Sequence, residues 1–213
     1  EAMTVELGEL IGQPLRGKIY RIYRDVRFSK DKTPYNTHVR MSFMPESKKD
    51  SAANPAFHFS LEPDKLIIGL GCFEFQKDVL ASYRQMVAND KTGSALAMIV
   101  AEMEQQSIRI DGPQYKRVPS GFDPDHPRSD LLRRKGLSAW HDAPLPEAIH
   151  GPDAVRLCVE QYRTMLPVYD WLSEVAYSAF WVTGSRQRSR QTLLTRIKPI
   201  RLFSLCQQVC FCW

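Results

Sequence analysis

Long apolar runs are missing from this sequence, and no export signal can be recognised in it. The longest uninterrupted apolar stretch runs only from Ala95 to Ala101. A membrane helix needs roughly 20 such residues. No charged start is followed by an apolar stretch and a small-residue cleavage site. The sequence therefore predicts a cytoplasmic protein without a membrane span.

Motifs for metals and nucleotide cofactors are also missing. Two of the five cysteines, Cys72 and Cys158, sit in apolar patterns typical of a core. The other three crowd the last eight positions: Cys206, Cys210 and Cys212. They lack a nearby histidine and paired C-x-x-C spacing, and an odd number of cysteines fits a reducing cytoplasm. Gly69-Leu70-Gly71 lacks the third glycine of a dinucleotide fingerprint. We therefore predict no metal and no cofactor.

Acidic residues are absent from the end of the chain, and this explains the net charge of +5. Six basic residues and no Asp or Glu follow Val175, which leaves 23 basic against 24 acidic residues in positions 1–174. The body of the protein is therefore near neutral, which makes a nucleic-acid partner for the body an unfavoured interpretation. We expect residues 181–213 to form a basic, cysteine-containing tail that is poorly ordered.

Alternating apolar and polar residues predict four strands. These lie near residues 19–28, 39–44, 57–62 and 66–72. In the third, Phe57, Phe59 and Leu61 would face a core, and the residues between them, beginning with His58 and Ser60, would face the other side. Short connections between successive strands favour an antiparallel sheet.

Helical spacing dominates the second half of the chain. Helices are predicted near residues 74–89, 95–106, 125–134 and 152–180. Pro167 predicts a break in the last one near Leu166. Strands first and helices later favour an α+β fold, with helices packed on one face of the sheet. We expect residues 1–180 to form a single domain.

Two blocks of sequence carry a resemblance to a known family. The first runs from Arg21 to Tyr35, and the second contains Lys116-Arg117-Val118-Pro119, Asp125-His126-Pro127 and Leu131-Leu132-Arg133-Arg134-Lys135-Gly136. Over residues 16–180 the chain resembles the family called domain of unknown function 2461. The resemblance implies no activity, cofactor or catalytic residue. It suggests a member truncated at its N-terminus, without a helix before Gly17, and with an unrelated C-terminal tail.

The segment from Arg21 to His38 is the predicted binding site, because it concentrates cations and carboxylates on one strand and turn. Guanidinium groups held by carboxylates suit the bidentate capture of phosphate or carboxylate. The predicted ligand-binding residues are Arg21, Arg24, Asp25, Arg27, Lys30, Asp31, Lys32, Tyr35, His38 and Arg117. We therefore expect a small anionic ligand. The opposing interpretation is an Arg–Asp ladder on a sheet surface, without a ligand.

The chemistry of the protein stays open at this point. His38, His126 and Asp125 are candidate acids or bases, since histidine titrates near neutral pH and a carboxylate can fix its tautomer. The alternative for Asp125-His126-Pro127 is a helix N-terminus. An enzyme of unassigned chemistry, a nucleic-acid-associated protein, and a structural or interaction module all remain possible functions. Aromatic residues interleaved with the cations keep the nucleic-acid alternative in view.

Overall fold

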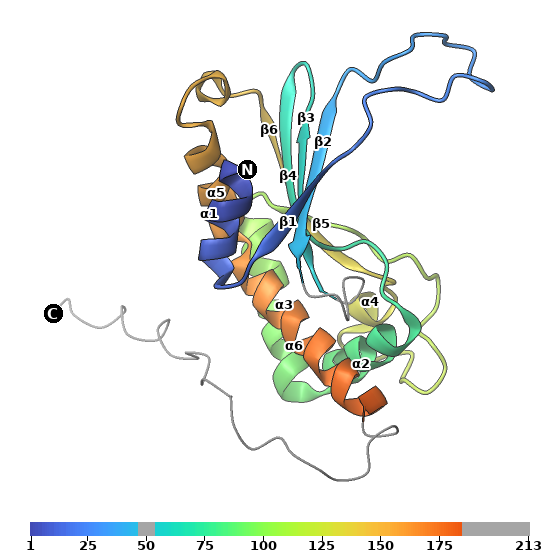
Figure 1. Cartoon of the computed structure of the whole chain (residues 1–213). Coiled ribbons are helices and arrows are strands. Elements are labelled where there is room, and N and C mark those ends of the chain that lie inside the picture. Colours follow the sequence, from blue (N-terminus) through green and yellow to red (C-terminus); the bar gives the residue numbers. More distant parts are fainter. Residues whose placement is uncertain (47–53, 185–213) are drawn as a thin grey trace, which may run out of the picture.

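One antiparallel sheet of six strands forms the centre of the protein, whose computed structural model describes residues 1–46 and 54–184 (Figure 1). The strands are β1 (Leu15–Ile19), β2 (Val39–Pro45), β3 (Ala56–Leu61), β4 (Lys65–Cys72), β5 (Arg109–Ile110) and β6 (Leu137–Pro144). Their order across the sheet is β1-β2-β3-β4-β6-β5. The first four strands form a meander, and a long crossover containing the short edge strand β5 separates β4 from β6.

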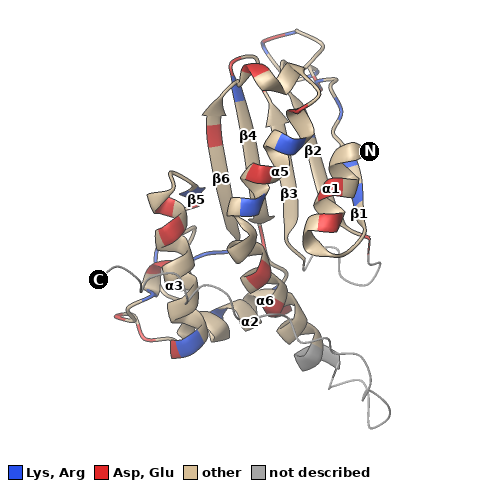
Figure 2. Cartoon of the chain, turned by 90° about the vertical axis from the view of Figure 1, so that its left-hand side faces the viewer, with Lys and Arg blue, Asp and Glu red and all other residues tan. Residues whose placement is uncertain are grey.

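Helices pack on one face of the sheet, partly against its strands and partly against one another. They are α1 (Ala2–Ile11), α2 (Lys77–Ala88), α3 (Asp90–Gln105), α4 (Ser129–Leu132), the short 3₁₀ helix η1 (Glu147–His150), α5 (Ala154–Thr164) and α6 (Leu166–Gly184). Helices α1 and α5 lie side by side over the sheet, and residues of both charge signs are spread over the outer surface on this side (Figure 2). The α+β class, the antiparallel sheet and the helices on one face are therefore confirmed.

The core lies between the sheet and these helices. Phe57 is fully buried and packs against Tyr162 of α5 and Tyr169 of α6, with ring centroids 5.2 and 5.4 Å away. Tyr162 also donates a hydrogen bond to the carbonyl of His58 at 2.6 Å. Cys72 and Cys158 are buried in the same core, as predicted. Because β3 alternates, the core face of Phe57 places His58 on the opposite face of the sheet.

The predicted break near Leu166 is confirmed. Helix α5 ends at Thr164 and α6 begins at Leu166, with Met165 between them. Pro167 lacks a backbone N–H and therefore fits only the first turn of a new helix. Both α5 and α6 contact β4.

The strand predicted near 19–28 is wrong beyond Ile19. Residues 20–38 leave the sheet as a long loop, held by a single bridge between Tyr23 and Tyr35 (Figure 1). The apolar side of the predicted alternation is not covered by a core, and Ile22 and Phe28 are 44 and 96% exposed. An alternating sequence makes a strand only where another strand pairs with it.

The prediction that no helix precedes Gly17 is also wrong, because α1 lies before it and covers part of the core. Leu7 is fully buried, and α1 packs on β1 and α5. Gly12 then ends the helix in the left-handed conformation, at φ 68°.

The helix predicted near 125–134 is reduced to Ser129–Leu132, since Pro124 and Pro127 keep the preceding residues in turns.

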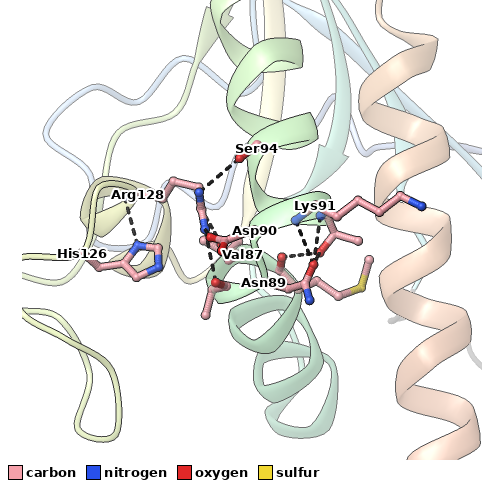
Figure 3. Close-up of polar contacts among 10 residues, drawn as sticks. Val87, Asn89, Asp90, Lys91, Ser94, His126 and Arg128 are labelled. Atoms are coloured by element: carbon pink, nitrogen blue, oxygen red, sulfur yellow. Dashed lines mark hydrogen bonds and ion pairs between the residues drawn. The ribbon is translucent and has the colours of Figure 1, made fainter.

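Arg128 ties this turn region to the junction of α2 and α3. Its guanidinium is one-tenth exposed and donates to the carbonyls of Val87 and Ala88, to Ser94 and to Asp90 (Figure 3). A side chain on Gly93 would overlap the carbonyl of Val87, so the close approach of α3 requires glycine there.

No helix within residues 1–46 and 54–184 is long and apolar enough to cross a membrane. The predicted basic tail falls almost entirely on residues 185–213, outside the described residues.

Candidate functional site

The face of the sheet opposite the helices carries a row of residues that comes from all six strands. The strand register places Lys18, Ser42, His58, Gly69, Trp140 and Arg109 next to one another across the sheet. A neighbouring row contains Arg40, Ser60 and Ile67. We call this surface the open face.

A pocket of about 620 Å³ lies on the open face. This volume is in the range that small-molecule sites occupy. The sheet supplies its floor, the β1–β2 loop one wall, and the segment that contains β5 another. Its polar and charged lining residues are Tyr20, Arg21, Asn36, His38, Arg40, Ser42, His58, Ser60, Glu62, Arg109 and Asp111, and its aromatic lining includes Phe73 and Trp140.

Aromatic rings form one end of the pocket. The ring of Phe73 lies 4.4 Å from His58 and 5.4 Å from Trp140, measured between centroids. Trp140 lies flat over Gly69, where any Cβ would overlap the indole. Its indole Nε1 donates to Asp111 at 2.9 Å, which fixes the plane of the ring. Phe73 is 58% exposed. The rings of Phe73 and Trp140 are tilted by 34° to one another, and the partly exposed ring of Phe73 suits stacking with a planar group.

A chain of hydrogen bonds leads from the pocket wall to the buried His58. The hydroxyls of Tyr20 and Ser42 are 3.1 Å apart, and Ser42 Oγ lies 3.1 Å from His58 Nδ1. Burial lowers the pKa of His58 to about 4, and the backbone of Gly71 partly opposes this shift. The imidazole is therefore neutral at pH 7. Ser42 is only 2% exposed, so it supports the histidine and does not present a nucleophile to the pocket.

Two arginines give the pocket unbalanced positive charge. Arg21 and Arg40 both line it, and neither has an ion-pair partner in the described part of the chain. The other charged groups are paired. Arg109 contacts Asp111 at 2.8 Å and Asp142 at 3.2 Å, and Glu62 lies 3.4 Å from Lys65. The Ser60 hydroxyl is buried beside Arg40 without a hydrogen-bond partner.

Most residues of the predicted Arg21–His38 site lie outside this pocket. Arg24 pairs with Asp31 at 2.5 Å, and Arg27 with Asp25 at 2.6 Å. Hydrogen bonds from Thr33 and Arg24 hold the pKa of Asp31 well below its usual range, and the contact with Arg27 lowers the pKa of Asp25. These pairs are local and neutralise one another, as the Arg–Asp interpretation expects, but they lie on a loop and not on the predicted sheet surface.

The remaining predicted ligand-binding residues are divided among several places. Arg21 and His38 line the pocket. Tyr35 lines a second hollow of about 400 Å³ that shares Asn36, His38 and Glu62 with it. Lys32 donates to the carbonyl of Val26 within the loop. Lys30 and Arg117 are exposed on loops and line neither hollow.

Of the candidate acids and bases, only His38 lines the pocket. Asp125 and His126 belong to the turn before α4. The Asp123 carboxylate accepts from the backbone N–H of Asp125 at 3.0 Å, and His126 Nδ1 accepts from that of Arg128 at 3.0 Å (Figure 3). Both are bonds from a side chain to the backbone two residues further on, in the turns before α4. The N-cap of α4 is Arg128, which makes no side-chain cap, so the predicted capping role of Asp125 is not found. Among residues 1–46 and 54–184, no group of three or more His, Cys, Asp or Glu side chains could hold a metal ion.

Several pocket residues were not singled out from the sequence: Arg40, Ser42, Phe73, Arg109, Asp111 and Trp140. The sequence of β3 gave a partial indication of this face, because its polar residues from His58 onward alternate with core residues. That alternation locates a polar face but does not show which residues of other strands lie beside it.

The fold and the pocket together define a class: an α+β protein with one antiparallel sheet, helices on one face and a ligand-sized pocket on the other. The model of a conserved hypothetical protein family, DUF2461, matches residues 2–171. The chain belongs to this family. A comparison with curated proteins finds no match.

Proposed function

We propose that this protein binds a small ligand that carries both an anionic group and a flat ring, in the pocket on the open face. The observation that carries the proposal is the meeting of two unpaired arginines, Arg21 and Arg40, with an aromatic surface in one pocket. Guanidinium groups recognise phosphate and carboxylate through paired N–H donors. Trp140 and Phe73 offer the face on which a ring would stack.

The neutral groups of the pocket add specificity to this arrangement. The hydroxyl of Ser60 is buried without a partner, and a buried polar group without a hydrogen bond is costly. A small repacking of the floor would let a ligand oxygen or nitrogen satisfy it. Tyr20 is 42% exposed, and its hydroxyl is a further donor or acceptor at the pocket wall. We place this function in the cytoplasm, as the number of cysteines suggested.

A thermal-shift screen with inorganic phosphate, nucleoside monophosphates and aromatic carboxylates tests the proposal. Compounds that combine a ring and an anion are expected to raise the melting temperature, because they bind only the folded state. Arg40→Gln should abolish the effect. Arg16→Gln is the matched control, since Arg16 lies on the same face of the sheet but outside the pocket. Stabilisation that is equal in both variants would count against the pocket.

Single-stranded nucleic acid is the second candidate ligand, and the exposed aromatic residues of the β1–β2 loop favour it. Tyr23, Phe28 and Tyr35 are 66, 96 and 52% exposed, and arginines and lysines lie between them. Bases stack on such rings while the cations contact phosphates. This candidate predicts binding that weakens steeply with salt, is lost in Phe28→Ala and survives deletion of residues 185–213. If neither ligand binds, the interaction-module alternative gains support.

A further inference from the structure

Buried polar atoms without hydrogen-bond partners gather in a second place, away from the open-face pocket. Seven such side-chain atoms occur in residues 1–46 and 54–184, and four of them are guanidinium nitrogens. They are Arg84 Nε, Arg133 Nε, Arg134 Nε and Arg134 Nη1. Native proteins leave few buried donors unsatisfied, so four in three arginines point to a missing acceptor.

Arg84 lies on α2, and Arg133 and Arg134 lie in the segment between α4 and β6, next to the contact of α2 with α4. The guanidinium of Arg84 and the ammonium of Lys135 each lie 5.3 Å from the ring centroid of Tyr115. Burial raises the pKa of Tyr83, and the charges of both Arg134 and Arg84 oppose that rise. Tyr115 therefore joins Arg84 to this segment, and its backbone N–H also donates to the carbonyl of Arg133 at 2.9 Å.

The charge of this cluster is not balanced by carboxylates. Arg133 pairs with Asp130, but Arg84, Arg134 and Lys135 have no ion-pair partner in the part of the chain that the structure describes. Arg134 is only 6% exposed. An arginine side chain cannot lose its proton to escape this cost, and a buried, unpaired charge strongly destabilises the folded state. A bound anion would supply both the missing acceptors and the missing charge.

We propose that a compact oxyanion, a phosphate or carboxylate group, binds between Arg84 and Arg134 beside Tyr115. Paired guanidinium N–H donors fit two oxygens of such a group. The cluster reaches the surface at Tyr115, which is 37% exposed. None of the cluster residues lines the open-face pocket, so this second site is independent of the proposed function.

Calorimetric titration of the full chain with inorganic phosphate tests the second site, with sodium chloride at matched ionic strength as the reference. Wild type should bind phosphate, and Arg84→Gln should weaken the binding at least tenfold. Arg84 is only partly buried, so this variant is expected to fold even if Arg134→Gln does not. Arg156→Gln is the matched control, since that arginine is 75% exposed and pairs with Asp153 on α5. A titration with acetate in place of phosphate shows whether a carboxylate group also binds at this site.

The same titration separates this site from the pocket. Arg40→Gln is expected to leave phosphate binding at the Arg84–Arg134 site unchanged. The proposal is overturned if wild type shows no binding of phosphate or acetate beyond chloride, or if Arg84→Gln binds as tightly as wild type. It is also overturned if Arg40→Gln loses the binding while Arg84→Gln keeps it, because the anion would then occupy the open-face pocket.

Discussion

At the scale of single residues, the imidazole of His58 is neutral because the sheet and two aromatic rings bury it. Its Nδ1 is occupied by Ser42, and the rings of Phe73 and Trp140 lie 4.4 and 5.8 Å away. Protonation would place an unpaired charge between those rings. The ring therefore resists protonation down to a pH near 4.

This burial predicts how stability depends on pH. The folded-state pKa of about 4 lies below the ordinary value of 6.5, so the unfolded chain takes up the proton first as the pH falls. The contribution of His58 is complete above pH 6.5 and is lost progressively between pH 6.5 and 4, by about 3 kcal/mol. Urea titrations over this range measure the free energy of unfolding at each pH. This free energy should fall less steeply with decreasing pH for His58→Gln than for wild type. His150→Gln, at an exposed position, is the control. Parallel curves for wild type and His58→Gln would contradict the burial of the ring.

Gly69 makes a second prediction at this scale. A methyl group there would overlap the indole of Trp140, which must then move off the pocket floor. Gly69→Ala is expected to destabilise the protein by about 1–3 kcal/mol, as other overpacked sites do. Gly112→Ala has open space around its Cβ and should change the free energy of unfolding by less than about 0.5 kcal/mol. Chemical denaturation of both variants makes the comparison, and equal stabilities would show that Trp140 does not lie on Gly69.

Which arginines of the site are unpaired could not be predicted from the sequence. The density of charge between Arg21 and His38 is real, but Asp25 and Asp31 neutralise two of its arginines through contacts of at most seven positions along the chain. Arg40 stands alone in the sequence and gave no signal, yet the register places it beside Ser60 at the pocket floor. A count of charges cannot distinguish a paired arginine from an unpaired one.

At the scale of elements, α1 is expected to hold the exposed flank of the core closed. Leu7 is fully buried between β1 and α5, whereas Val5 on the same helix is 58% exposed. Leu7→Ala should therefore cost about 2–5 kcal/mol, and Val5→Ala less than about 1 kcal/mol. Thermal or urea unfolding measures both. If the two substitutions cost the same, α1 does not pack as described.

The elements that could be predicted from the sequence are those that bury a continuous apolar face. Strands β2, β3 and β4 were found because one of their faces is continuously apolar, and α5 and α6 because of a long apolar stripe broken at Pro167. Strand β6 was missed, since its core positions include the small Ala139 and the half-buried His141. The strand near 19–28 was overpredicted because alternation alone does not show whether a partner strand exists.

At the scale of the whole molecule, the candidate site is a product of the strand order. Arg40 and Trp140 are 100 positions apart, and β3 and β4 lie between their strands. The crossover after β4 returns the chain as β6 next to β4, which brings Trp140 over Gly69 and beside His58. The sequence predicted the sheet and its helix-covered face. It could not predict this pocket, because the pairing of β6 with β4 is a long-range contact that leaves no local pattern.

The central claim is that a ligand with a ring and an anion occupies the open-face pocket, and the indole N–H of Trp140 reports on it directly. That group donates to Asp111 at the pocket wall, and its NMR signal can be assigned by its absence in Trp140→Phe. In titrations with nucleoside monophosphates and aromatic carboxylates, we predict a saturable shift of this signal for at least one class. Arg40→Gln should weaken that binding at least tenfold and Arg16→Gln should not. An unmoved Trp140 signal with every compound, or equal binding by both variants, would contradict the account.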